Sequence, residues 1–283
     1  MADTPGMEDL RGEIVSPVVQ NYAMENFTMR QVCTVIKTSK EVNTYYEETD
    51  SNITRTVTTG ITATTFAGIP EGAAFPFVEH SWTETNARML KHGADHFMTW
   101  EVANLSAIDV KARMYERIGQ AIAHSEDTAI ITELATTTST AAATATWDNA
   151  TESLQQPLKD ILKGIAAMQV RNWNAYKNLY IIMHPNNFME LMNNPVCRNA
   201  GTYEILNNGR RGRIAGATII VNNASTENTV LMCIGQSAMS LYEAKPLTTV
   251  VIPQEGIGYT IRSWLMNVPV LVNNYAAYKI TGC

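Results

Sequence analysis

A threonine-rich stretch near the beginning of the chain is the feature that most constrains its fold. Seven of the thirteen residues from 53 to 65 are threonine. β-Branched side chains favour an extended backbone, and Thr59-Gly60 lies between two such runs, where a turn fits. We therefore expect residues 42–82 to form a long two-stranded ribbon that closes near Phe77.

This ribbon has too few apolar residues to bury a core of its own. Ile53, Val57, Ile61 and Phe66 are separated by threonines, and a lone two-stranded hairpin is marginally stable in water. The stretch is therefore either a floppy surface loop or a ribbon that lies on another subunit. We favour docking, because disordered segments are poor in β-branched residues. Together with Arg55, these four residues are the predicted intersubunit contacts of the ribbon.

The rest of the chain has the pattern of an α+β protein. After a capping-box pattern at Ser106, apolar residues recur at three- and four-residue steps and predict a helix over residues 107–134. Residues 1–30 show no helical stripe and are expected to be an extended arm. The other expected elements, in chain order, are a strand at 31–37, a loop or irregular strand at 135–151, a helix at 154–168, a strand at 178–183, a short helix at 185–192, a loop at 193–213, and strands at 217–222, 229–234, 239–244, 247–252, 256–265 and 268–280.

The charge content indicates a chain whose surface is covered by other subunits. Charged residues make up 17% of the sequence, against about 25% in typical domains. The net charge of -6 argues against a dedicated nucleic-acid-binding protein. Residues 1–135 carry 10 basic and 19 acidic side chains, whereas residues 136–283 carry 11 and 8. This asymmetry is either chance or a means of pairing the first half of one copy with the second half of another.

Cysteine usage and hydropathy indicate a cytoplasmic product. The four cysteines form no CxxC motif and are expected to be reduced. The first residues do not resemble a signal peptide, and no apolar run is long enough for a membrane span. We therefore expect no membrane partner.

Nucleotide-binding and hydrolase motifs are absent or incomplete. There is no P-loop, and the pair Gly256 and Gly258 lacks the third glycine of a dinucleotide fingerprint. Ser237 lacks the second glycine of a nucleophile elbow, so a turn between strands is the simpler interpretation. We expect no cofactor.

Two short segments are the remaining candidates for catalysis. His92, Asp95 and His96 stand close in sequence, with Glu101 nearby. Gly93 disfavours a helix that would align the two histidines, so a polar turn is the competing interpretation. Cys197 is a candidate thiol nucleophile, because the adjacent Arg198 could lower its pKa.

A cluster of arginines lies in the long loop that ends at residue 213. Arg198, Arg210, Arg211 and Arg213 belong to it. A solvated loop and nucleic-acid contact are alternatives, but we favour contact with acidic groups of a neighbouring copy, because arginine forms bidentate pairs with carboxylates.

The order of these segments resembles the major capsid proteins of tailed viruses, which have the HK97-type fold. The resemblance covers nearly the whole chain and is carried by order and spacing: EGAAFPFVEHSW at the end of the ribbon, the helix VKARMYERIGQAIAHSEDTAIITEL, the segment LYIIMHPNNFMELMN, the glycine-bearing loop before IAGATIIVNNAS, and the closing strands from TTVVIPQ to KITG.

The resemblance implies a division of the chain into named parts. An N-terminal arm and first strand would occupy residues 1–41, and an E-loop ribbon over an adjacent subunit residues 42–80. A peripheral domain with a spine helix would occupy residues 81–153 and an axial domain residues 154–244. Residues 245–283 would return to the peripheral domain, and the arginine loop would lie near the five- and six-fold axes.

The resemblance also implies a function without catalysis. The chain would assemble through pentamers and hexamers into an icosahedral shell around double-stranded DNA, in a virion assembled in the host cytoplasm. Portal, scaffold or decoration proteins would be its other partners. Two alternatives stay open: an encapsulin-like compartment that encloses cargo enzymes, and a soluble metal- or thiol-dependent enzyme.

Overall fold

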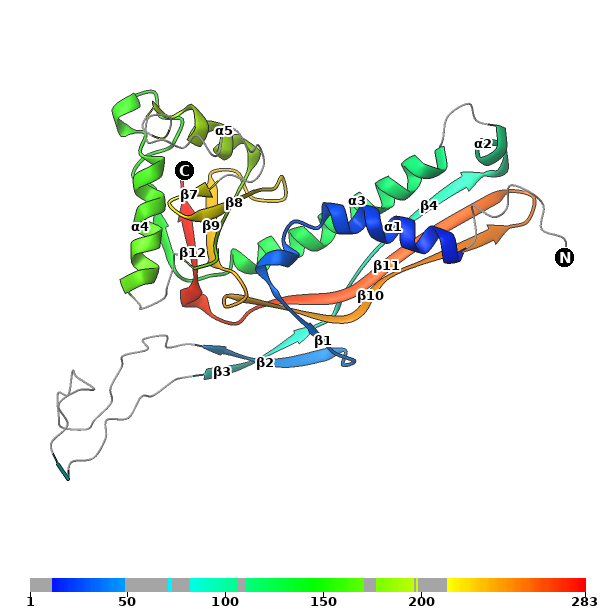
Figure 1. Ribbon diagram of the computed structural model, residues 1–283, viewed down its shortest axis with the longest axis horizontal. Helices are drawn as coiled ribbons and strands as arrows, with labels where there is room; N and C mark the ends of the chain where they lie inside the picture. The colour runs from blue at the N-terminus through cyan, green and yellow to red at the C-terminus, as the bar shows by residue number, and fades with distance from the viewer. Residues whose placement is uncertain are drawn as a thin grey trace. The chain divides into compact units, whose positions relative to one another are not determined.

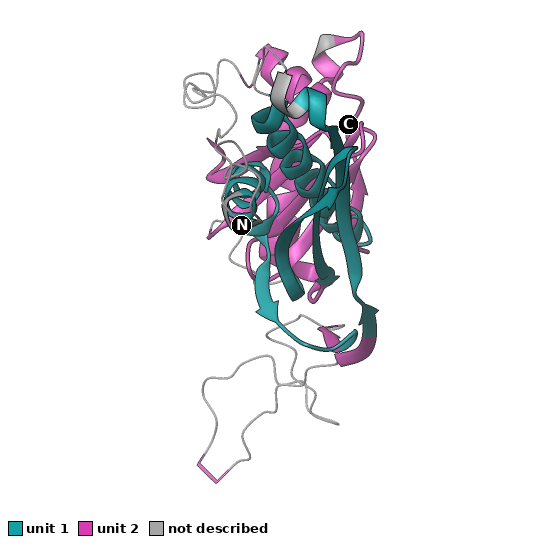
Figure 2. Cartoon of the chain, turned by 90° about the vertical axis from the view of Figure 1, so that its right-hand side faces the viewer, with its two compact units in different colours: residues 1–43, 86–136, 239–270 teal, residues 44–85, 137–238, 271–283 magenta. Residues whose placement is uncertain are grey.

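The computed structural model describes residues 12–48, 71–72, 82–105, 110–170, 177–195, 197 and 213–283. The chain divides into two compact units, which Figure 2 distinguishes by colour. Unit 1 comprises residues 1–43, 86–136 and 239–270, and unit 2 comprises residues 44–85, 137–238 and 271–283.

Unit 1 is built on a four-stranded sheet with the order β1-β10-β11-β4. The strands are β1 (Thr34–Lys37), β4 (Leu90–Thr99), β10 (Met239–Gln254) and β11 (Gly258–Leu271). Strand β1 is parallel to β10, and β4 is antiparallel to β11. The long strands β10 and β11 run side by side in Figure 1.

Helices α1 (Gly12–Asn26) and α3 (Val110–Leu134) pack against each other and against this sheet. Their shared core contains Val19 of α1, Ile118 and Ile122 of α3, and Ile261 and Leu265 of β11. The apolar stripe of α3 is therefore buried in this core, as the sequence predicts. The capping box at Ser106 lies outside the described residues, and the short helix α2 (Trp100–Leu105) precedes it.

The prediction of an extended arm over residues 1–30 is wrong for its second half, because residues 12–26 form helix α1. Pro17 lies inside this helix and hides its helical pattern. Val15, Val19 and Ala23 nevertheless recur at four-residue steps and are fully buried in the core of unit 1. Packing of this stripe outweighs the local preference against helix. A short 3-10 turn, η2 (Arg30–Val32), then leads to β1.

Three strand boundaries also differ from prediction. The segments 239–244 and 247–252 form the single strand β10, and the predicted break at residues 266–267 lies inside β11. Residues 92–96 belong to strand β4 and not to a polar turn. In each case pairing along the neighbouring strands continues the extended backbone through a local breaker, such as Pro246 or Gly93.

Unit 2 contains a six-stranded mixed sheet with the order β5-β12-β9-β6-β8-β7. Five predicted elements are confirmed with small shifts at their ends: β6 (Leu179–Met183), β8 (Ala217–Val221), β9 (Thr229–Ile234), α4 (Pro157–Val170) and α5 (Pro185–Asn193). The predicted strand 268–280 is divided, because its first residues belong to β11 and β12 (Ala277–Thr281) follows the 3-10 turn η4 (Asn274–Ala276). The sheet also contains β5 (Thr140–Ala142), in the segment expected to be a loop or irregular strand, and β7 (Arg213–Ile214), which was not predicted; nor was the 3-10 turn η3 (Glu152–Leu154).

Local sequence signals explain how the two helices of unit 2 begin and pack. Pro185 occupies the first turn of α5, where its missing N–H is not needed, and the His184 side chain accepts a hydrogen bond from Asn186 N. Helix α4 lies against β12. At Gly164 a Cβ atom would come within 2.7 Å of Met232 Sδ, so the glycine permits this close packing.

A separate two-stranded sheet joins β2 (Val42–Glu48) and β3 (Trp82–Arg88). Strand β2 lies at the start of the predicted ribbon, but its partner β3 begins at Trp82, where the predicted ribbon ends, so this strand was not predicted. The predicted turn at Thr59-Gly60 and the closing point near Phe77 lie outside the described residues.

The contact units differ from the expected domain boundaries. Residues 271–283 group with residues 137–238, whereas the resemblance assigns all of residues 245–283 to one domain. The names peripheral and axial stay predictions. Among the described helices, none is long and apolar enough to cross a membrane.

Candidate functional site

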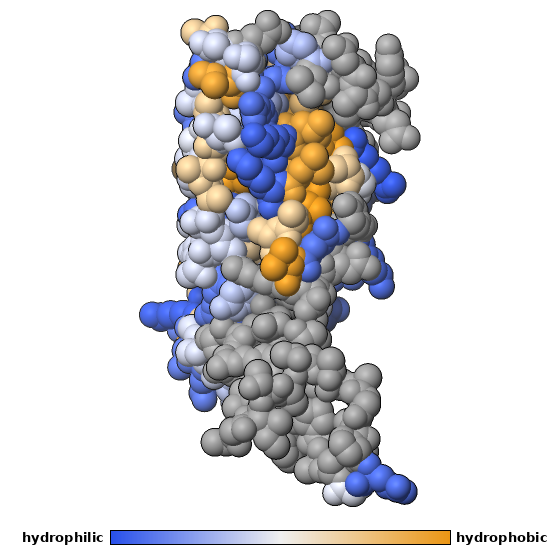
Figure 3. All heavy atoms as spheres, turned by 90° about the vertical axis from the view of Figure 1, so that its left-hand side faces the viewer, coloured by the Kyte–Doolittle hydropathy of each residue, from blue (hydrophilic) through white to orange (hydrophobic). Residues whose placement is uncertain are grey.

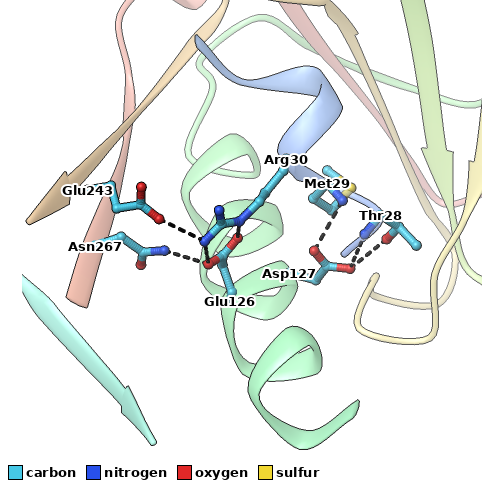
Figure 4. A network of polar contacts seen from close by, with 7 residues as sticks. All are labelled: Thr28, Met29, Arg30, Glu126, Asp127, Glu243 and Asn267. Atoms are coloured by element: carbon cyan, nitrogen blue, oxygen red, sulfur yellow. Dashed lines mark hydrogen bonds and ion pairs between the residues drawn. The ribbon is translucent and has the colours of Figure 1, made fainter. Parts of the chain in front are cut away.

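A buried carboxylate on α3 organises a cluster of polar contacts in unit 1, which Figure 4 shows. Glu126 is fully buried. Arg30 donates to it from Nε at 2.5 Å and from Nη2 at 2.8 Å, and Asn267 Nδ2 donates at 2.6 Å. Arg30 also reaches Glu243 of β10 at 3.2 Å. One arginine thus links η2, helix α3 and the sheet.

The neighbouring carboxylate, Asp127, holds the chain that follows α1. It accepts hydrogen bonds from Thr28 N at 3.2 Å, Thr28 Oγ1 at 2.5 Å and Met29 N at 3.1 Å. Burial raises the pKa of Asp127, although these three hydrogen bonds act in the opposite direction. All four oxygens of Glu126 and Asp127 face protein donors (Figure 4), so this cluster joins elements and does not form an open reactive site.

The strand conformation of β4 separates the metal candidates. Successive side chains of a strand point to opposite faces, so Asp95 lies on the other face from His92 and His96. Buried His92 contacts Ser125 Oγ through Nδ1 at 2.8 Å, whereas His96 is exposed. Asp95 pairs with Arg262, whose Nη2 lies 2.6 Å from Oδ2. No group of residues suited to a metal ion occurs among the described residues.

Cys197, the candidate thiol nucleophile, lies in a buried position. Cys197 is 3% exposed, and burial raises the pKa of its thiol, so the expectation of a lowered pKa is wrong. Arg198, the residue expected to lower it, lies outside the described residues. Burial also raises the pKa of Cys33 and of Cys283 to about 12.

The two weak glycine and serine motifs occupy turns. Gly256 has a φ of +73° in the turn between β10 and β11, and at Gly258 a Cβ atom would collide with the Met98 carbonyl oxygen. Ser237 lies in the turn from β9 to β10, where its N–H donates to the Ile234 carbonyl oxygen. Turns between strands and close strand packing therefore explain Gly256, Gly258 and Ser237.

One of the predicted intersubunit contact residues lies within the described part of the chain. Arg213 is exposed on β7, at the edge of the six-stranded sheet. The other eight, Ile53, Arg55, Val57, Ile61, Phe66, Arg198, Arg210 and Arg211, lie outside the described residues.

Sequence reasoning missed the apolar surface at the base of the ribbon. Val42 and Tyr46 of β2 are 48% and 57% exposed, and Trp82 of β3 is 55% exposed. The available signal in the sequence was the recurrence of Val42, Thr44 and Tyr46, residue types that favour strands, at every second position. Large exposed apolar side chains on a two-stranded sheet are typical of an interaction surface.

Comparison with known families identifies the chain. A family model described as "Phage capsid protein" matches residues 82–280. The chain belongs to the phage capsid protein family. The match starts at β3 and includes strands β4, β10 and β11 of the four-stranded sheet and all the strands of the six-stranded sheet, but not β1 or β2.

Solved structures show the same fold at low sequence identity. A virus-like particle from Pyrococcus furiosus is 13% identical with a TM-score of 0.65, over 95% of this chain and 98% of that chain. The capsid of cyanophage P-SCSP1u is 14% identical with a TM-score of 0.61, over 90% and 88%. The mature capsid of bacteriophage PhiM1 is 15% identical with a TM-score of 0.63, over 90% and 86%. No curated protein sequence matches the chain.

These findings confirm the resemblance, the α+β capsid fold and the assignment as a major capsid shell protein. Membership of this family makes the chain a component of the virion and indicates a structural protein that assembles with copies of itself.

Proposed function

We propose that this capsid protein forms pentamers and hexamers that close into an icosahedral shell around double-stranded DNA. The observation that carries the proposal is the β2–β3 sheet, in a chain of the phage capsid protein family. Tyr46 and Trp82 on this sheet are more than half exposed. A two-stranded sheet gains stability by packing on another surface, and a neighbouring subunit supplies one in a shell.

The predicted contacts complete this proposal. Ile53, Arg55, Val57, Ile61 and Phe66 are proposed to lie on an adjacent subunit. Arg213 is exposed and available for pairing with an acidic neighbour, and Arg198, Arg210 and Arg211 are proposed to contribute similar pairs. Residues 1–41 would serve as the arm, residues 42–80 as the E-loop, residues 81–153 and 245–283 as the peripheral domain, and residues 154–244 as the axial domain.

Deletion of residues 50–68 tests the ribbon. We expect a soluble, folded subunit that forms no closed shells, as seen by negative-stain electron microscopy of the purified protein. Normal particles from the deletion would contradict the proposed role. Charge reversal of Arg210 and Arg211 is expected to slow capsomer formation, measured by light scattering during assembly, and an unchanged scattering curve would refute that part.

An encapsulin-like compartment is the second candidate, because one similar structure is of a virus-like particle. The two functions differ in what the shell encloses. Nuclease-resistant DNA in purified particles would support a viral capsid, and a packaged enzyme would support a compartment. Portal, scaffold or decoration proteins, and assembly in the host cytoplasm, belong to the viral alternative.

We also propose that the chain is not an enzyme and needs no cofactor. His92, Asp95 and Cys197 are engaged or buried in the two units. Metal analysis of purified particles, together with normal assembly of a His96→Ala variant, would support this proposal. Stoichiometric metal that is lost in the variant would overturn it.

A further inference from the structure

Helix α4 of unit 2 is apolar on two sides. Its inner side is buried against the sheet through Ile161, Ile165 and Met168, together with Pro157 and Gly164. On the outer side Leu158, Leu162, Ala166 and Val170 follow one another at four-residue steps. Figure 3 shows an apolar strip that is flanked by hydrophilic side chains on this face of the molecule. A helix at the surface of a globular protein normally has one apolar face, so a second apolar strip indicates a surface that another partner covers.

The outer side of α4 borders a groove of about 600 Å³. Leu158, Leu162 and Ala166 form its apolar wall, and Lys159 and Lys163 stand at its rim. Leu162 is 44% exposed and Val170 is 83% exposed. Covering these side chains removes apolar surface from water, which is the main driving force of association.

A second surface of unit 2 has the opposite charge. Glu190 of α5 accepts a hydrogen bond from Asn187 Nδ2 at 3.3 Å. Burial raises the pKa of Glu190, and the negative charges of Asp148 and Glu227 raise it further. Asn186 Nδ2 donates to Glu227 Oε1 at 2.7 Å, which ties the start of α5 to the turn before β9. Met189 projects from the same helix and is 63% exposed. None of these three carboxylates has an ion-pair partner among the described residues.

The groove and this acidic surface share no residue. A contact between them is therefore head-to-tail, and such a contact forms rings when the rotation between subunits closes. An exposed methionine flanked by carboxylates complements an apolar groove rimmed by lysines, since the apolar side chain enters the groove and the charges pair at its edge.

We infer that the α4 groove, lined by Leu158, Leu162 and Ala166, binds a second copy of this chain through the acidic α5 surface that carries Met189 and Glu190. This inference rests on the proposed function and deepens it, because it names the two surfaces that join subunits within a capsomer. Lys163 already pairs with Asp160 at 3.3 Å. Lys159 Nζ donates to Gln156 Oε1 at 2.7 Å and has no ion-pair partner among the described residues, so its charge is available to the neighbour.

Substitution of Leu162 by glutamate tests the groove. The side chain is partly exposed on a helix, so the subunit should fold, with an unchanged circular dichroism spectrum. Burial of an unpaired carboxylate in the interface should weaken association by about 100-fold or more. Leu162→Met, which keeps volume and apolarity, is the matched control and should assemble normally. Ala166→Glu is an independent second variant with the same expected loss.

A mixing experiment tests the direction of the contact. The Leu162→Glu variant keeps an intact acidic surface, and a Glu190→Lys/Glu227→Lys variant keeps an intact groove. Each alone should remain monomeric in light scattering coupled to size-exclusion chromatography. Their mixture should form heterodimers of about twice the 31.3 kDa subunit mass, and no rings, because each pair has only one intact contact between a groove and an acidic surface.

The outcomes separate this inference from the proposed function. Normal capsomers from Leu162→Glu, or from both groove variants, would overturn the inference and leave the shell function standing. That result would also be expected if a small molecule, and not a subunit, fills the groove. Absence of heterodimers on mixing would overturn the head-to-tail contact. Failure of the wild-type chain to form particles would instead count against the proposed function itself.

Discussion

Replacement of Arg30 by methionine tests whether the polar cluster on α3 stabilises unit 1. The substitution keeps much of the apolar stem but removes two of the three hydrogen bonds to Glu126 and the contact with Glu243. It also removes the guanidinium from its position 4.3 Å above the centre of the Phe27 ring. Glu126 would then be a fully buried carboxylate with Asn267 as its remaining donor in this cluster.

The magnitude follows from the burial of the two partners. Breaking a buried ion pair by removing one partner costs about 3–5 kcal/mol, because a buried charge is left uncompensated. The Arg30 side chain is 26% exposed, so water can reach part of the vacated space. We therefore expect the lower end of that range, about 3 kcal/mol, in the free energy of unfolding at pH 7.

Urea unfolding of the unassembled subunit, followed by circular dichroism at one protein concentration, measures this loss. Arg88→Met is the matched control, because the Arg88–Glu41 pair is 78% and 68% exposed and should contribute about 1 kcal/mol or less. Addition of Glu126→Gln to Arg30→Met should recover part of the loss, since the buried group becomes neutral. If Arg30→Met destabilises no more than Arg88→Met, the reasoning about the buried cluster is wrong.

Three other predictions follow from the described units. Gly119→Ala should lower the free energy of unfolding in urea by about 1–3 kcal/mol, because the new Cβ would lie 2.9 Å from Ala23 N. Helix propensity alone favours alanine, so a gain in stability would contradict this packing. Burial lowers the pKa of His92, although Glu126 and Asn267 oppose the shift. The unfolded chain therefore binds more protons near pH 6.5, so the free energy of unfolding should fall as the pH decreases through this value. His92→Gln should reduce this dependence of stability on pH. An equal pH dependence in the variant and the wild type would refute the role of His92. Iodoacetamide at pH 8 should leave Cys33 and Cys283 unlabelled in the native subunit and label them in urea, as detected by mass spectrometry. The reason is that both thiols are buried, and burial raises their pKa to about 12. Rapid labelling of the native subunit would show that they are accessible.

Elements with a strong local period could be predicted from the sequence. The stripe of α3 and the apolar runs of β6, β8 and β9 specify their structure directly, because the burial of one face fixes the conformation. Strand β2 could be predicted as the start of the ribbon, but its partner β3 could not, because Trp82–Arg88 lies beyond the threonine-rich stretch and has no buried face. The family could also be inferred, since the order of these elements along the chain is a property of the sequence.

Helix α1 and the long strands of unit 1 required the tertiary structure. Pro17 opposes a helix locally, and Val15 and Val19 stabilise α1 only because they pack in a core with α3. Similarly, Pro246 interrupts the pattern of β10, but pairing with the neighbouring strands maintains the extended backbone. Packing energy that comes from distant residues overrides local preference at these places.

The sequence alone determined the kind of protein, its main helices and strands, and its need for partners. Only the tertiary structure decided which polar and apolar groups are hidden. Glu126 and Asp127 have the sequence appearance of a solvated helix face, yet they are buried because their donors come from residues about one hundred positions away. Conversely, Leu162 has the sequence appearance of a core residue, yet it is left exposed because the sheet covers only one side of α4. Burial depends on which surfaces meet in space, and that is set by long-range packing that no local pattern contains.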